Sequence, residues 1–142
     1  MLPEFKICKK HNFMFACHRH WPQFQSIYVA QFAQKYKIKT IFAGKICDDY
    51  PLKQFIDNKY TFYLGEIPDQ IKLEYYQAAR LTTLIHDWPT PFNLSAIEAL
   101  SNSCPVACNL DKGFWPTLIQ DGTNGFHVPS ATNEFANQTQ EF

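Results

Sequence analysis

The chain has 142 residues, of which 46% are apolar and 16% aromatic, and its 13 basic and 13 acidic residues give a formal net charge of zero. This apolar content excludes a disordered chain, and the balanced charge excludes a broad field for binding nucleic acid. No apolar run is long enough to span a membrane and no signal-peptide core is visible at the N-terminus, so we expect one cytoplasmic domain over residues 1–142.

Short apolar runs alternate with amphipathic stretches along the chain. Strands are predicted, in order, at residues 13–17, 39–43, 60–64, 81–85, 106–108 and 125–128. Helices are predicted at residues 22–36, 51–56, 69–79, 94–101 and 115–119, and a further helix from residue 131. The alternation predicts an α/β fold, a Rossmann-like doubly wound sheet of about six mainly parallel strands with helices on both faces.

Apolar spacing also predicts which helix faces are buried. Phe24, Ile27, Tyr28 and Phe32 share one face of the helix at 22–36. In the helix at 69–79, the residues predicted to face the sheet are Ile71, Tyr75 and Ala78.

The five cysteines are odd in number and form no Cys-x-x-Cys pair. Three of them, Cys17, Cys47 and Cys108, lie at or beside apolar runs, which favours free buried thiols. The segment Cys17-His18-Arg19-His20 could be taken for a metal cluster, but no second ligand pair follows at a usual zinc spacing. We therefore expect neither a metal nor another cofactor.

Right-handed crossovers place the carboxyl ends of the strands along one edge of such a sheet, where ligands bind. The loops predicted at that edge span residues 18–22, 44–50, 65–68, 86–93 and 109–116. Arg19 lies in the first of them, where a guanidinium can fork onto a diphosphate beside the start of the next helix. The alternative is that Arg19 is a solvated loop residue.

The segment Ser95 to Glu98 has two interpretations. It fits a capping box, with Ser95 as N-cap and Glu98 reaching back to it. A carboxylate at this position also suits a vicinal diol, because it offers two acceptor oxygens. The backbone amides of Phe92, Asn93, Leu94 and Ser95 lie at the predicted helix start, where they could donate to a sugar or phosphate.

Two further patterns have weaker functional interpretations. Asp48-Asp49 after the second strand invites comparison with response regulators, but those need their acidic pair after the first strand. The aromatic residues Tyr75, Tyr76, Trp88 and Trp115 could form a carbohydrate-binding surface or belong to the core.

Residues 86–125 carry the most specific pattern. It comprises Pro91-Phe92 and Glu98-Ala99-Leu100, then Pro105-Val106, and finally Asp121-Gly122-Thr123-Asn124-Gly125-Phe126. These residues resemble the C-terminal, sugar-nucleotide-binding domain of retaining family-4 glycosyltransferases with the GT-B fold. The family signature is E-P-F-G-L-x-x-x-E-A-L, followed by P-V and D-G-x-x-G-F.

The resemblance implies transfer of a hexose-type sugar from a nucleoside diphosphate to a hydroxyl acceptor with retention, in carbohydrate biosynthesis. The family has a second, N-terminal acceptor domain that this chain lacks, so we expect that domain to be missing or supplied by a separate chain. The implied partner is a nucleoside diphosphate sugar, with no nucleic acid.

By resemblance, Arg19 would hold the diphosphate, Glu98 the ribose, and Thr90 with the amides of residues 92–95 the sugar and phosphate. These three side chains are the catalytic candidates, and Pro91 and Gly113 also match donor-binding positions of the family.

Several family residues are replaced. Thr90 and Thr117 take the place of glutamates, Phe24 of a lysine, and Asn93 and Phe114 of glycines. We therefore expect the isolated chain not to transfer sugar, and a non-catalytic binding or interaction domain stays open as the alternative.

Overall fold

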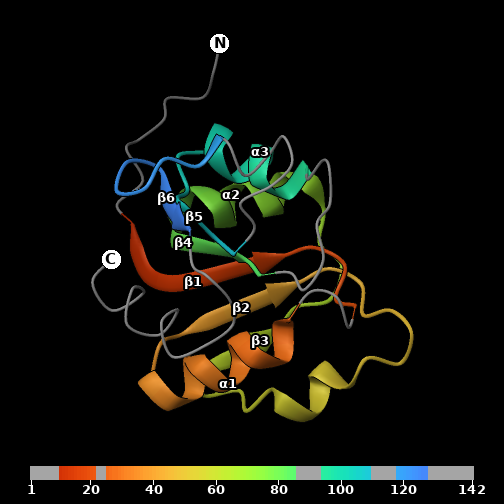
Figure 1. Ribbon diagram of the computed structural model, residues 1–142. Helices are drawn as coiled ribbons and strands as arrows, with labels where there is room; N and C mark the ends of the chain where they lie inside the picture. The colour runs from red at the N-terminus through yellow and green to blue at the C-terminus, as the bar shows by residue number, and fades with distance from the viewer. Residues whose placement is uncertain (1–9, 22–24, 86–93, 110–117, 128–142) are drawn as a thin grey trace.

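The computed structural model describes residues 10–21, 25–85, 94–109 and 118–127 (Figure 1). Its centre is one six-stranded sheet in the order β3-β2-β1-β4-β5-β6, and every neighbouring pair is parallel. The strands are β1 (His11–Cys17), β2 (Thr40–Ala43), β3 (Thr61–Tyr63), β4 (Ala79–Leu84), β5 (Val106–Cys108) and β6 (Gly125–His127). This is the strand order of a Rossmann fold, so the predicted fold class is confirmed.

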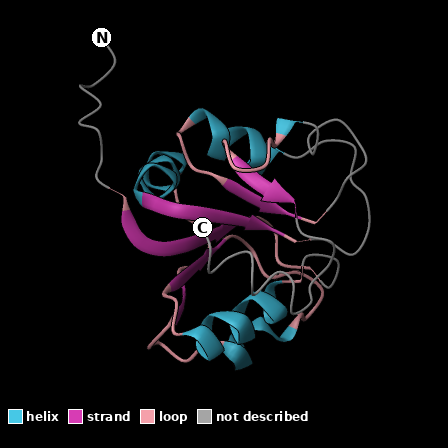
Figure 2. Cartoon of the chain, turned by 60° about the vertical axis from the view of Figure 1, so that its left-hand side comes forward, coloured by secondary structure: helices cyan, strands magenta, loops and turns pink. Residues whose placement is uncertain are grey.

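Helices cover both faces of the sheet (Figures 1 and 2). One face carries α1 (Ser26–Tyr36) and the 3-10 helix η1 (Pro51–Phe55), and the other carries α2 (Asp69–Ala78) and α3 (Leu94–Ser101). The sheet therefore has a buried surface on each side, which explains why its strands are almost continuously apolar.

Alternation along β1 divides the core into two layers. Phe13, Phe15 and Cys17 pack in the cluster on the side of α2 and α3, whereas Met14 and Ala16 pack in the cluster on the side of α1. Successive strand residues point to opposite faces, so this single strand anchors both helix layers. Three residues of the predicted face of α1 are consistent with this: Phe32 is buried, and Ile27 and Tyr28 are partly buried against the same cluster. The fourth, Phe24, lies outside the described residues.

The prediction for α2 is partly wrong. Ile71 is 38% exposed, whereas Tyr76 is fully buried and packs edge-on against Phe15. These two α2 residues lie about 140° apart around a helix of 3.6 residues per turn, so they cannot share a buried face. Helix α2 also ends at Ala78 and passes directly into β4, which therefore begins earlier than predicted.

Other expectations are settled only in part. The helix predicted at 115–119 falls largely outside the described residues, and the one from residue 131 falls wholly outside them. None of the four described cysteines is in a disulfide bond. Cys17 and Cys108 are buried as predicted, and so is Cys104, but Cys47 is only half-buried, so the prediction for Cys47 is wrong. In the described part of the chain, no helix has both the length and the apolar character needed to cross a membrane.

Candidate functional site

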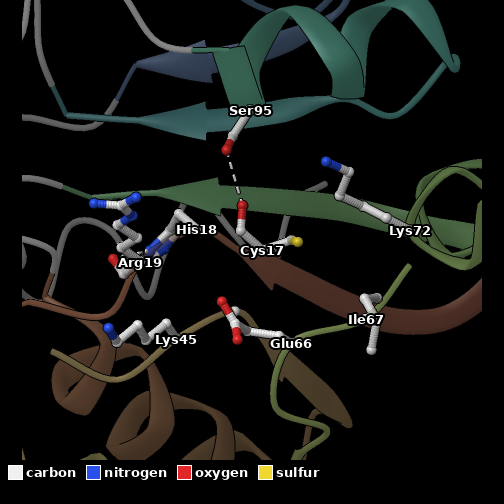
Figure 3. A pocket seen from close by; sticks show the side chains of 9 residues that line it. Cys17, His18, Arg19, Lys45, Glu66, Ile67, Lys72 and Ser95 are labelled. Atoms are coloured by element: carbon white, nitrogen blue, oxygen red, sulfur yellow. Dashed lines mark hydrogen bonds between the residues drawn. The ribbon is translucent and has the colours of Figure 1, made fainter. Parts of the chain in front are cut away.

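A pocket of about 210 Å³ opens at the carboxyl edge of the sheet, close to where the strand order reverses between β1 and β4 (Figure 3). Open α/β sheets bind ligands at this place. Its walls come from the loops after β1, β2 and β3 and from one residue each of α2 and α3. The lining residues are Cys17, His18, Arg19, Gly44, Lys45, Glu66, Ile67, Lys72 and Ser95.

The loops after β1 and β2 keep the register of the strands that precede them. Cys17 pairs with Ala43 at the end of the ladder, and His20 forms a parallel bridge with Ile46. The same offset places Arg19 opposite Lys45. Backbone hydrogen bonds maintain this arrangement, because the His20 amide donates to the Lys45 carbonyl at 2.8 Å and the Cys47 amide donates to the His20 carbonyl at 3.1 Å.

Gly44 allows the two loops to approach this closely. Its φ is +113°, a conformation that favours glycine, and a Cβ atom at this position would lie 2.0 Å from the carbonyl oxygen of His18. A side chain at residue 44 would therefore separate the loop after β2 from the loop after β1.

His20 is a structural residue beneath the pocket rather than a ligand-binding one. It is fully buried, with Nε2 2.9 Å from the Ala43 carbonyl oxygen and Nδ1 2.7 Å from the Ser26 hydroxyl. A carbonyl can only accept, so Nε2 carries the proton and Nδ1 accepts from Ser26. Burial, with a smaller contribution from His18, lowers the pKa of His20 to about 2, which keeps the ring neutral.

Both ring nitrogens of His20 are thus occupied within the fold. Over the ranges that the structure describes, no three His, Cys, Asp or Glu side chains are placed to share a metal ion.

Ser95 joins the start of α3 to the end of β1. It is the second residue of α3, and its hydroxyl donates to the Cys17 carbonyl at 2.9 Å (Figure 3). The predicted capping box is therefore wrong, because Ser95 bonds to β1 and the Glu98 carboxylate contacts another helix. The bond to Cys17 holds the N-terminal turn of α3 against the pocket.

Glu98 forms an ion pair across the two helices of its layer. Its Oε2 lies 2.8 Å from Nζ of Lys72 in α2, and the same ammonium lies 3.3 Å from Oδ1 of Asp69. Desolvation would lower the pKa of Lys72, but hydrogen bonds to Glu98 and Asp69 outweigh it and raise that pKa. Glu98 does not line the pocket itself and reaches it through Lys72.

The structure brings together some of the predicted site residues. Arg19 and Ser95 line the pocket, and Leu94 is 64% exposed at the start of α3. Five predicted residues lie outside the described part of the chain: Thr90, Pro91, Phe92, Asn93 and Gly113.

Lys45 and Lys72 line the pocket and were missed by the sequence analysis. Only weak signals pointed to them. Lys45 directly follows the glycine that ends the second strand, and Lys72 follows Asp69 at the spacing of a helical ion pair.

Two alternative interpretations are wrong on structural grounds. Asp48 and Asp49 lie in the loop after β2 with φ of +55° and +53°, and the strand order differs from the 2-1-3-4-5 order of response regulators. Tyr76 is fully buried and Tyr75 stacks on Phe15 at 5.2 Å between ring centroids, so both belong to the core. The other two aromatic candidates, at residues 88 and 115, lie outside the described residues.

Comparison with known families identifies the class of protein. The family model described as "Glycosyl transferases group 1" matches residues 17–142. The chain belongs to this family, and its six-stranded parallel sheet is that of a GT-B glycosyltransferase domain.

Solved structures with similar folds include HepE from Anabaena, crystallised with UDP and glucose, at 26% identity and a TM-score of 0.74 over 92% of this chain and 38% of HepE. AviGT4, a glycosyltransferase involved in avilamycin A biosynthesis, has 16% identity and a TM-score of 0.72 over 94% of this chain and 42% of AviGT4. Sucrose-phosphate synthase from Thermosynechococcus elongatus has 17% identity and a TM-score of 0.76 over 92% of this chain and 36% of the synthase.

The last two similarities concern the fold alone. This chain spans about two fifths of the length of these proteins or slightly less. A comparison with curated protein sequences gives no match.

Proposed function

We propose that this domain binds the sugar-nucleotide donor of a glycosyltransferase that moves a hexose-type sugar to a hydroxyl acceptor with retention of configuration. The observation that carries the proposal is the pocket at the carboxyl edge, where Arg19, Lys45 and the start of α3 meet in a chain of the glycosyltransferase group 1 family. The HepE structures with UDP and glucose and with UDP-glucose support a nucleoside diphosphate sugar as the ligand class.

Each proposed contact follows from the chemistry of the residue. Arg19 suits the diphosphate, because its guanidinium can donate two parallel hydrogen bonds to phosphate oxygens. Ser95 brings the positive end of the α3 dipole to the same pocket, which favours an anion there. Thr90 and the amides of residues 92–95 complete the proposed site on the side of the sugar.

Glu98 is the proposed ribose ligand. In this proposal its ion pair with Lys72 orients the carboxylate and leaves acceptor sites for the ribose. A carboxylate has about four acceptor sites, and the contact of Glu98 with Lys72 is made through Oε2. The remaining acceptor sites could take hydrogen bonds from a ribose diol. Lys72 also lines the pocket, so it links the ribose side of the proposed site to the phosphate side.

The same ion pair is the observation that favours a second candidate function, a non-catalytic binding or interaction domain. A Glu98 carboxylate already satisfied by a lysine can serve the fold alone, without any nucleotide. The replacements at Thr90, Phe24 and Thr117 remove charges that the resembling family uses, and they favour the same candidate.

Calorimetric titration of the chain with UDP, ADP and GDP tests the proposal. We expect one of the three to bind at micromolar to millimolar affinity, and uridine, adenosine or guanosine alone to bind more weakly. No detectable binding of any diphosphate would leave the non-catalytic interaction domain as the better conclusion.

A further inference from the structure

We infer that Lys45 forms, with Arg19, a two-cation clamp for the diphosphate of the bound nucleotide. The inference rests on the proposed function and extends it, because it assigns a specific phosphate contact to a residue that follows β2. Neither the family match nor the resemblance in the sequence points to Lys45.

The register of the two loops places Arg19 and Lys45 side by side. Arg19 and Lys45 occupy the same register of two parallel loops, bracketed by the pairs Cys17–Ala43 and His20–Ile46. Neighbouring parallel strands lie about 4.8 Å apart, so the two backbones hold their side chains within reach of one small anion. Both residues line the pocket, and Figure 3 shows them on one side of it, with Lys72 across from them.

The charges of Arg19 and Lys45 also favour an anion between them. In the part of the chain that the structure describes, neither Arg19 nor Lys45 forms an ion pair, whereas Lys72 is paired with two carboxylates. Like charges directly opposite each other on neighbouring strands repel. An anion bound between the two cations would offset this repulsion, and a diphosphate offers oxygens to both.

Among the described residues that line the pocket, one is a carboxylate, Glu66. No ion pair joins Glu66 to Arg19 or Lys45 among the described residues. The two cations are therefore not neutralised by direct contact, although Glu66 reduces the local positive potential. The clamp is consequently expected to be sensitive to salt.

Contacts within the fold also fix the backbone of the loop that carries Lys45. The carbonyl of Lys45 accepts from the His20 amide, and Gly44 packs its backbone against the carbonyl of His18. The His20 ring is in turn held by Ala43 and Ser26. The backbone of Lys45 is thus fixed relative to Arg19 before any ligand arrives, so binding does not need to order the loop.

The test measures binding of UDP, UMP, uridine and inorganic pyrophosphate by calorimetry at several salt concentrations. The proteins are wild type, Arg19→Gln, Lys45→Gln and Lys45→Arg, with Lys37→Gln as control. Lys37 is an exposed lysine at the end of α1, away from the pocket, and its substitution changes the net charge equally. Thermal unfolding establishes that every variant is folded.

We expect Lys45→Gln to weaken UDP binding about tenfold at low salt, the scale of a lost hydrogen bond to a charged group at a solvated site. Its affinity should depend less steeply on salt than that of wild type, and uridine binding should not change. Lys45→Arg should restore most of the affinity, and Lys37→Gln should behave as wild type. A smaller loss for UMP than for UDP would place Lys45 on the distal phosphate.

Several outcomes would overturn the inference. If UDP binds wild type and Arg19→Gln weakens it, but Lys45→Gln stays within twofold of wild type, the clamp is wrong and the proposed function stands. If no nucleoside diphosphate binds but pyrophosphate binds in a Lys45-dependent way, the clamp stands and the proposed function fails. If pyrophosphate does not bind either, both are wrong.

Discussion

The two sides of the pocket differ in whether their basic residues form ion pairs with other described residues. On the side of β1 and β2, Arg19 and Lys45 stand opposite each other on rigid loops, and no described residue forms an ion pair with either. On the side of α2 and α3, Lys72 is shared between Glu98 and Asp69. The first side therefore has two cations that the proposed diphosphate could bind, whereas on the second side the Lys72 ammonium is already paired with two carboxylates.

Because of this difference, we expect substitutions on the two sides to have different effects on ligand affinity and on the stability of the fold. Substitutions of Arg19 and Lys45 should change affinity with little effect on folding, because both residues are exposed and neither forms an ion pair with a described residue. Substitutions in the helix pair should change both, because Lys72 lines the pocket and also forms an ion pair with Glu98.

The largest expected effect is on the loop framework of the first side. Gly44→Ala should cost more than about 3 kcal/mol of the free energy of unfolding, because it adds a clash with the His18 carbonyl to an unfavourable positive φ. Urea unfolding measures the cost. Gly65→Ala is the matched control, since φ at Gly65 is +74° and a Cβ there would meet nothing within 4 Å. It should lose only about 1–2 kcal/mol; equal losses would mean that the close approach of the two loops is unimportant.

Arg19→Gln should have the largest effect on binding. We expect affinity for UDP to fall about 10- to 100-fold, since an arginine can donate two charge-assisted hydrogen bonds to phosphate. The free energy of unfolding should change by less than about 0.5 kcal/mol, because Arg19 is exposed and forms no ion pair with the residues that the structure describes. Calorimetry and urea unfolding give the two quantities. A variant that loses stability but not affinity would place Arg19 in the fold rather than in the site.

Glu98→Gln tests the ribose contact on the second side. If Glu98 holds the ribose, the substitution should weaken UDP binding by about 1–3 kcal/mol and leave pyrophosphate binding unchanged. Stability should fall by about 1 kcal/mol, because the pair with Lys72 is only partly buried. Unchanged UDP affinity together with lower stability would support a purely structural ion pair.

Lys72→Met should destabilise the protein by about 1 kcal/mol at neutral pH, because it leaves Glu98 and Asp69 without their shared cation. The pKa of Lys72 is raised above its ordinary value of 10.5 in the folded protein. Its contribution is therefore fully present below that unfolded pKa and is lost as pH rises through the higher folded pKa. The difference in unfolding free energy between wild type and Lys72→Met, measured from pH 7 to 11.5, should shrink only above about pH 10.5.

The sequence predicted the fold because its signals are local. Each predicted strand is a short, mainly apolar run that ends in or before a polar or glycine-containing loop, and each of the first five predicted helices lies between two such runs, so the order of elements follows from periodicity. The exception in α2, where Tyr76 rather than Ile71 is buried, arises because apolar spacing leaves the phase of a short helix open. Contacts with Phe15 and Cys17 of β1 then decide it.

The site was less predictable because its contacts join distant segments. Arg19 could be suspected from its place after the first strand, but its partner Lys45 follows a different strand, and only the register of the sheet brings the two together. Of the two interpretations of Glu98, a capping box and a ribose ligand, neither included its ion pair with Lys72, because that lysine approaches from the preceding helix. Long-range pairs of this kind need the packed structure.

The smallest expected effect concerns Glu66, the carboxylate on the same pocket as the two unpaired cations. Glu66→Gln should tighten UDP binding about two- to threefold at low salt, the scale of removing one charge about 6–8 Å from a phosphate in a solvated site. The gain should disappear at 0.5 M salt, where such interactions are screened. Glu74→Gln is the control, because Glu74 is exposed on α2 and does not line the pocket. If Glu66→Gln weakened binding instead, the carboxylate would have to accept a hydrogen bond from the ligand, and the phosphates would have to lie further toward Arg19.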